Sequence, residues 1–204
     1  EVVIPFQFDY SYKCRMWDFA YLFHNGYCIM TNKSGDLGLI DKGGNWVVEP
    51  EYDEIWAPHS SGYRVIVKNG KHGVLDSNCA VVYPVEYGHI DILSDGFVLT
   101  KDGKRWQEDF EGNITQPFMF DGTYDLRYPN GYDCCGDLVY ELADFVQYEV
   151  MNSYGIMNRI TGEPITPAIY SDINMLSKDL FEVQESDSYD WYLLDTNGNV
   201  VSKK

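Results

Sequence analysis

The stretch GLIDKGGNWVVEPEYDEI at 38–55 has a close counterpart, GVLDSNCAVVYPVEYGHI, at 73–90. Each copy contains an apolar run, a turn that begins with Asp, an apolar pair, a Pro and then an aromatic residue. Short apolar runs bounded by Gly, Asn or Asp are typical of strands joined by hairpins. A motif that recurs at this spacing predicts a fold built from stacked supersecondary units.

The same parts recur along most of the chain. The turn part is found at GLIDKGG (38–44), GVLDSN (73–78), WQEDFEG (106–112), GIMNRITG (155–162) and YLLDTNG (192–198). The Pro–aromatic part is found at VVEPEYDEI (47–55), VVYPVEYGHI (81–90), ITQPFMFD (114–121), ITPAIYSDI (165–173) and VIPFQFD (3–9). The segment 122–137 lies outside the pattern and reads as an insertion. The next segment, LVYELADFVQYEV at 138–150, is rich in β-branched and aromatic residues, so it predicts a strand and not a helix.

The residues that recur at the turns have local physical reasons. An Asx side chain at the end of a strand can hydrogen-bond to the backbone two residues further on. Asx side chains stand there at Asp41, Asp76, Asp109, Asn158 and Asp195. Gly44 follows Asp41 in the first copy, where we expect the positive φ that Gly adopts most cheaply. In the second copy we assign the corresponding place to Asn78.

Pro and aromatic residues end each repeat. Pro interrupts a strand, so Pro50, Pro84, Pro117 and Pro167 predict edge strands or strand ends. The aromatic residues that follow are expected to fill one equivalent packing position in every repeat. These residues are Tyr52, Tyr87, Phe120 and Tyr170.

This order of parts resembles that of the WG repeat family. The likeness extends over nearly the whole chain and leaves out 122–137. The chain departs from the family in one respect, because it contains no Trp-Gly pair. The Trp position is filled by Leu37, His72, Arg105, Tyr154 and Trp191. The resemblance implies an all-β, propeller-like repeat array, in a family whose members mostly have no assigned activity.

We therefore expect an all-β fold, a repeat of short antiparallel strands in a propeller-like array of five small units. A single domain, 1–204, would contain units at 10–55, 56–90, 91–121, 122–173 and 174–204. The sequence stops before the last unit has its Pro and aromatic residue, and VIPFQFD at 3–9 is such an ending. Residues 1–9 are thus expected to complete the last unit and to close the array into a ring. In the competing arrangement, an open row, these residues only cap the first repeat.

The charge of the chain argues against some classes of partner. The 204 residues include 15 Lys and Arg and 32 Asp and Glu, which gives a formal net charge of −17. A surface this acidic repels phosphate backbones and anionic membranes, so we expect no nucleic acid partner. No apolar run approaches the roughly 20 residues that span a bilayer, so no membrane insertion is expected. The same charge attracts cations and basic proteins.

The first residues and the cysteines bear on the compartment. EVVIPFQF lacks the basic start and the apolar stretch of a signal peptide. It also lacks an initiator Met, which indicates a trimmed or processed product and leaves export open. The five cysteines have no metal-site spacing and are expected to be unpaired thiols, which favours the cytoplasm. They are Cys14, Cys28, Cys79, Cys134 and Cys135.

No motif in the sequence points to catalysis. The four histidines, at 24, 59, 72 and 89, do not stand at metal-ligand spacing. Neither G-x-S-x-G, nor a P-loop, nor G-x-G-x-x-G occurs. DTNGN at 195–199 lacks the register of a calcium loop and reads as a hairpin turn. We therefore expect no catalytic residue, no metal, no cofactor and no enzymatic activity.

The insertion at 122–137 holds the candidate binding residues, because loops that interrupt repeats often carry a binding surface. These residues are Tyr124, Arg127, Tyr128 and Tyr132, whose types are enriched in interfaces and sugar sites. The first hypothesis is a monomeric binding or scaffolding module that recognises a protein partner. The alternative is a carbohydrate-binding or glycan-processing protein, based on abundant Tyr, Trp and carboxylates. A functionally neutral loop is the third reading of the insertion.

Overall fold

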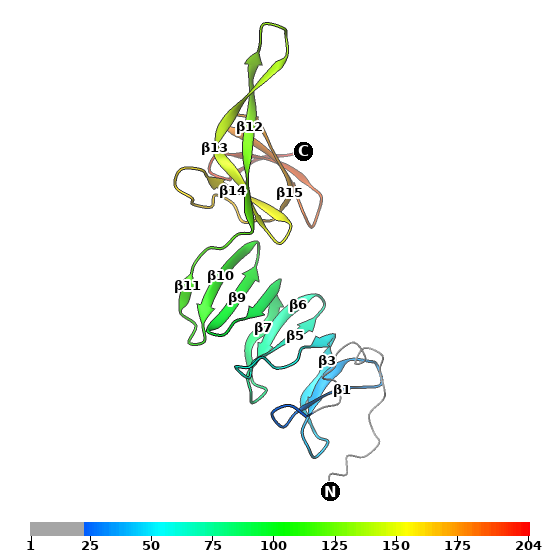
Figure 1. Ribbon diagram of the computed structural model, residues 1–204. Helices are drawn as coiled ribbons and strands as arrows, with labels where there is room; N and C mark the ends of the chain where they lie inside the picture. Colours follow the sequence, from blue (N-terminus) through cyan, green and yellow to red (C-terminus); the bar gives the residue numbers. More distant parts are fainter. Residues whose placement is uncertain (1–22) are drawn as a thin grey trace. The chain divides into compact units, whose positions relative to one another are not determined.

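The computed structural model describes residues 23–204 (Figure 1). All regular secondary structure in this range is β-strand, in several antiparallel sheets, so the expected all-β fold is confirmed. A helix that is long and apolar enough to cross a membrane is absent from the same residues. Residues 1–9, which were predicted to complete the last unit, lie outside the described range. The closed ring and the number of five units therefore stay predictions.

The chain divides into two compact units. The first contains the described residues up to Lys101 together with Glu108–Asn113, and the second contains Asp102–Gln107 together with Ile114–Lys204. The boundary thus passes through the strand at Lys104–Asp109.

The strands before residue 117 form three small sheets. Their orders are β1-β2-β3, β4-β5-β6-β7 and β11-β10-β9-β8, so neighbours in each sheet are also neighbours in sequence. This is the arrangement that the predicted succession of hairpins requires. The strands are β1 (Cys28–Thr31), β2 (Leu37–Ile40), β3 (Trp46–Tyr52), β4 (Glu54–Ile55), β5 (Arg64–Lys68), β6 (Lys71–Leu75), β7 (Val81–Tyr87), β8 (His89–Ile92), β9 (Gly96–Lys101), β10 (Lys104–Asp109) and β11 (Ile114–Gln116).

The strands after residue 121 form one seven-stranded sheet in the second unit. They run in sequence order from β12 to β18, and each neighbouring pair is antiparallel. The strands are β12 (Gly122–Tyr132), β13 (Leu138–Val150), β14 (Ser153–Asn158), β15 (Tyr170–Ser177), β16 (Leu180–Glu185), β17 (Trp191–Asp195) and β18 (Val200–Lys203). The strand predicted at 138–150 is confirmed as β13. The segment read as an inserted loop is instead β12 and the turn after it, which form a long hairpin with β13.

The Asx turns predicted from the repeat are present. Asp41 Oδ1 accepts hydrogen bonds from the backbone N–H groups of Gly43 at 2.8 Å and Asn45 at 2.9 Å. Gly44 adopts a φ of 81°, and its N–H donates to the Asp41 carbonyl at 3.0 Å. The side chains of Asp76, Asp109, Asn158 and Asp195 accept equivalent bonds from the residue two positions on.

Two turns differ from what the sequence predicted. In the second copy the positive φ belongs to Cys79, at 66°, and not to Asn78, because Cys79 is the residue that stands three positions after Asp76. The insertion also contains a turn of the same kind. Asp133 Oδ1 accepts from the N–H groups of Cys135 and Asp137, and Gly136 has a φ of 88°. DCCG at 133–136 therefore reverses the chain between β12 and β13 as DKGG does between β2 and β3.

The residues that end the repeats pack as expected in all but one copy. Tyr52 lies in register with Leu37, Tyr87 with His72, and Tyr170 with Tyr154, so the aromatic residue faces the Trp position of its own repeat. Phe120 departs from this pattern, since its side chain is 43% exposed. In that copy Phe118 is the packed aromatic residue, with its ring 5.2 Å from that of Tyr148.

Candidate functional site

The four predicted binding residues all lie on β12. Tyr124 is exposed, and its hydroxyl donates to Glu149 Oε2 at 2.6 Å. Tyr128 is half-buried against the core of the second unit, and its hydroxyl donates to Glu141 Oε2 at 2.7 Å. Both carboxylate hydrogen bonds raise the pKa of the tyrosine that donates them. Two of the four candidate binding residues, Tyr124 and Tyr128, are therefore held in contact with β13.

Arg127 and Tyr132 lie apart from that pair. Leu126 and Tyr128 both contact the core, so the Arg127 between them projects from the opposite face of the strand. Tyr132, at the outer end of β12, is 74% exposed. The structure thus does not gather the four predicted residues into one pocket.

The outer half of the β12–β13 hairpin forms a projecting arm, defined here as residues 127–142 (Figure 1). Apolar side chains are exposed along it and form neighbouring cross-strand positions, because Tyr132 pairs with Leu138 and Pro129 pairs with Tyr140. A strand that packs on one face alternates buried and exposed residues, but here consecutive residues are exposed. The exposed large apolar residues of the arm are Tyr132, Leu138, Val139, Tyr140 and Leu142.

Four of these arm residues were missed by the sequence analysis. Leu138, Val139, Tyr140 and Leu142 were assigned to an ordinary strand of the repeat. The signal that identifies them is the unbroken apolar run LVY, directly after the turn DCCGD. Consecutive apolar residues make both faces of a strand apolar, and exposed apolar surface of this kind is typical of interaction sites.

The arm carries more negative than positive charge. Arg127 is opposed by the carboxylates of Asp133, Asp137 and Glu141. The hydrogen bond from the backbone of Asp137 lowers the pKa of Asp133, and the bond from Tyr128 lowers that of Glu141, so both remain ionised under ordinary conditions. Cys134 and Cys135 are exposed at the tip, with their Sγ atoms 3.9 Å apart, well beyond a disulfide bond length.

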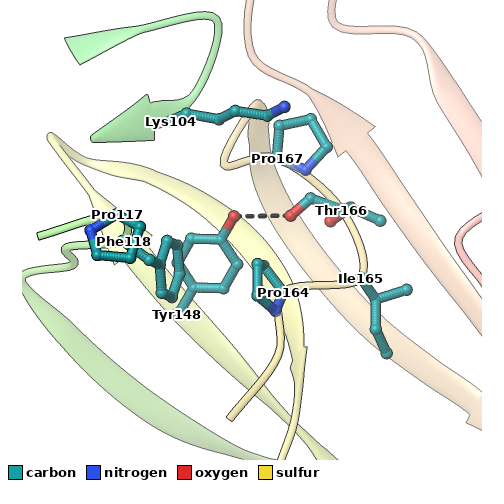
Figure 2. Close-up of a pocket in the computed structure, with 8 residues that line it drawn as sticks. All are labelled: Lys104, Pro117, Phe118, Tyr148, Pro164, Ile165, Thr166 and Pro167. Atoms are coloured by element: carbon teal, nitrogen blue, oxygen red, sulfur yellow. Dashed lines mark hydrogen bonds between the residues drawn. The ribbon is translucent and has the colours of Figure 1, made fainter. Parts of the chain in front are cut away.

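A pocket of about 330 Å³ lies elsewhere in the second unit (Figure 2). Its lining residues come from four separate segments of the chain, namely Lys104, Pro117, Phe118, Tyr148, Pro164, Ile165, Thr166 and Pro167. The Tyr148 side chain is buried, and its hydroxyl donates to the Thr166 carbonyl at 2.6 Å. Burial raises the pKa of Tyr148 to about 12, so this phenol is neutral in the pocket wall.

Two histidines that are separate in sequence meet in the first unit. The ring centroids of His72 and His89 are 4.9 Å apart, and the Trp56 ring lies 5.9 Å from that of His72. Burial, and then the proximity of His89, lower the pKa of His72. Within residues 23–204, no group of three His, Cys, Asp or Glu side chains is arranged to hold a metal ion. We therefore treat this cluster as packing between repeats.

Comparison with protein families identifies the repeat. The model of the WG containing repeat matches residues 38–71 and 154–189. The first match covers the turn at Asp41, and the second covers the turn at Asn158 and the packed Tyr170. The resemblance seen in the sequence is confirmed. No curated protein matches the chain.

Comparison with solved structures gives distant similarities. Hsv2 from Kluyveromyces lactis has 11% identity and a TM-score of 0.30, with 91% of this chain and 62% of that chain covered. A protein of unknown function from Bacteroides caccae has 10% identity and a TM-score of 0.27, with 87% and 77% covered. This chain thus spans less than two thirds of the length of Hsv2.

Proposed function

We propose that this chain, which carries WG containing repeats at 38–71 and 154–189, is a non-catalytic module that binds a protein partner through the β12–β13 arm. The observation that carries the proposal is the exposure of apolar side chains on consecutive residues of the arm. Contiguous apolar surface of this kind marks interaction sites in proteins.

The base of the arm is fixed, which favours binding. Leu126 and Ala143 are buried in the core of the second unit at the point where the arm begins. The hydrogen bond between Tyr128 and Glu141 then joins the two strands further out. A preformed binding element loses little conformational entropy when it meets its partner, so more of its contact energy contributes to affinity.

The charge of the arm defines the chemistry of the partner. The arm contains one Arg and three carboxylates among its apolar residues in the sequence, and the whole chain carries a net charge of −17. We infer a partner whose apolar surface is bordered by Lys and Arg, because complementary charge speeds association and selects the orientation. The same charge repels a second copy of the chain, so we propose a monomer.

Carbohydrate binding is the alternative function. The exposed Tyr124, Tyr132 and Tyr140 rings offer faces on which a sugar could stack. Two observations favour a protein instead. The hydroxyls of Tyr124 and Tyr128 already donate to carboxylates, and the exposed Leu138, Val139 and Leu142 offer no hydrogen bond to a sugar hydroxyl.

A pair of matched triple variants tests the proposal. Tyr132→Ser, Tyr140→Ser and Leu142→Ser together remove apolar surface from the arm. Val81→Ser, Val82→Ser and Ile160→Ser remove exposed apolar side chains from outside the arm. A partner captured with the wild-type chain would be purified, and its affinity for each variant measured by calorimetry. We expect at least a ~100-fold loss with the arm variant and little change with the control.

Two results would contradict the proposed function. Equal affinity of the two triple variants for the purified partner would show that the arm is not part of the interface. A glycan that binds the wild-type chain and the control variant, but not the arm variant, would favour the carbohydrate alternative. Light scattering on the wild-type chain tests the monomer in the same samples.

We also propose the closed, propeller-like ring of five units. The pairing of Leu194 with Val200 in the last hairpin repeats that of Leu75 with Val81, so both hairpins have the same register. Beside Trp191, which occupies the Trp position, the described residues leave a hollow of about 300 Å³ lined by Glu182, Trp191 and Lys204. Phe8 stands three residues after Pro5, as Tyr87 does after Pro84, and is the aromatic residue that we assign to the last unit.

A further inference from the structure

We propose that the pocket in the second unit binds a small aromatic carboxylate. This site is separate from the arm, and neither its lining nor its ligand depends on the protein-binding function. Figure 2 shows the lining side chains arranged around the Tyr148 ring, with Lys104 at one side and the 164–167 segment opposite Phe118.

The size and walls of the pocket select one aromatic ring. A volume of about 330 Å³ is at the lower end of the ~300–1,000 Å³ typical of small-molecule sites. The Phe118 and Tyr148 rings meet edge to face at 81°, with their centroids 5.2 Å apart, and form one wall. The pyrrolidine rings of Pro117, Pro164 and Pro167 form much of the remainder. Flat apolar faces at different angles favour a planar apolar group over a polar or flexible one.

The hydrogen-bond donors in the 164–168 segment are nearly all in use. Pro164 and Pro167 have no N–H group. The N–H groups of Ile165 and Thr166 both donate to the Ile156 carbonyl, and that of Ala168 donates to the Gly103 carbonyl. The Thr166 hydroxyl is different, because its oxygen accepts from the Ile156 N–H at 3.0 Å and its proton has no acceptor among the described residues. Thr166 lines the pocket and is only 5% exposed, so its hydroxyl has little access to bulk water.

Lys104 supplies the charge. Its ammonium forms no ion pair within the described part of the chain, although the chain contains 32 Asp and Glu. An unpaired cation beside a pocket with aromatic and proline walls is suited to a ligand that combines an apolar body with an anionic group. The Lys104 ammonium and the Thr166 hydroxyl together provide two donors for one carboxylate.

The turn before Lys104 holds the backbone of this residue beside the pocket. Gly103 has a φ of 69°, and a Cβ atom there would lie 2.6 Å from the Ala168 carbonyl oxygen. Only Gly allows the two backbone segments to come this close. The Ala168 N–H then donates to the Gly103 carbonyl at 2.9 Å and holds the segments together. The segment that bears Lys104 is therefore held against the segment that bears Thr166.

Phenylacetate, with phenylacetamide as its neutral counterpart, tests the proposal on the full chain. Chemical-shift titration should show saturable binding of phenylacetate that perturbs the amides of Phe118, Tyr148 and Thr166. Loss of the charge-assisted hydrogen bond should weaken phenylacetamide binding about tenfold or more. Lys104→Met should weaken phenylacetate binding by a similar factor and leave phenylacetamide binding unchanged. Lys104→Arg should restore most of the affinity.

The matched control is Lys71→Met, which removes the same charge from an exposed lysine of β6 in the first unit. It should leave the phenylacetate affinity at its wild-type value. Thr166→Val is not a clean test of the hydroxyl donor, because it would also leave the buried Ile156 N–H without an acceptor. Absence of saturable binding would overturn the proposal. So would an equal loss in the Lys71 and Lys104 variants, or shifts confined to residues outside the pocket.

Discussion

Single Asp side chains shape most of the hairpin turns. Each accepts two backbone hydrogen bonds within its turn, and in several turns an Asn four residues on donates to the same carboxylate. These bonds lower the pKa of Asp41, Asp109 and Asp195, with the Asn residue of the same turn as the largest cause in each. A Gly or, in one copy, Cys79 then takes the positive φ that reverses the chain.

The lowered pKa values predict how the fold responds to acid. A carboxylate whose pKa is lower in the folded state stabilises the fold above its unfolded pKa of about 3.9, and this contribution is lost as the pH falls through the folded-state value. Replacing Asp41, Asp109 and Asp195 by Asn should therefore flatten the fall in melting temperature between about pH 5 and pH 2.5. Asp187→Asn, at a carboxylate that accepts no hydrogen bond in the described residues, should not. If the melting temperature of the triple variant falls with pH as steeply as that of the wild-type chain, this role of the turn carboxylates is refuted.

The φ of Gly44 predicts the cost of a side chain there. A β-branched residue is strained at a φ of 81°, so Gly44→Val should lower the free energy of unfolding by about 1 kcal/mol or more. The control is Lys42→Val in the same turn, where φ is not positive and the change should be small. Denaturant unfolding measures both. Equal midpoints for Gly44→Val and the wild-type chain would show that the turn relaxes without strain.

Hairpins are the elements of this fold, and the sequence predicts most of them. An Asp or Asn that ends a strand, followed in all but the second copy by a Gly three or four residues on, is a local signal, and five of the turns were located from it. The arm was not predicted, because β12 contains Pro129, Asn130 and Gly131, which are signals for a loop. β12 remains a strand because it is the edge of its sheet, where Pro is tolerated, and because register shifts adjust its pairing near Pro129.

The hairpin between β13 and β14 offers a stabilising substitution. Its two turn residues, Met151 and Asn152, both have positive φ, at 51° and 64°. This two-residue turn favours Asn at the first position, whereas Met is strained there. Met151 is exposed, so Met151→Asn should raise the free energy of unfolding by about 0.5–1 kcal/mol. Met151→Ala, which keeps the strain, should not. A melting temperature of Met151→Ala equal to or above that of Met151→Asn would refute this interpretation of the turn.

On the scale of the whole molecule, what the sequence predicts depends on distance along the chain. The all-β fold and the order of the hairpins follow from contacts between neighbours in sequence. The pocket could not be predicted, because Lys104, Phe118, Tyr148 and Thr166 meet only after three hairpins have formed between them. The contact between the His72 and His89 rings was also missed, because the two residues lie on strands of different sheets.

The predicted ring makes residues 1–9 part of the stability of the last unit. Their deletion should lower the free energy of unfolding by several kcal/mol, on the scale of burying two or three large side chains. Phe8→Ala should reproduce a large part of this loss and Gln7→Ala should not, because only the first removes the aromatic residue. Denaturant unfolding of the three variants measures the effect. A truncated chain that unfolds like the full one would support the open row.

Pro129 has a consequence for how copies of this chain behave at high concentration. It lies in the edge strand β12 and offers no N–H group to an incoming strand, and the register on either side of it is shifted. A second copy therefore cannot extend the seven-stranded sheet across this edge by continuous backbone pairing. The projecting hairpin can therefore present Tyr and Leu side chains while its β12 edge offers only an interrupted template to an incoming strand.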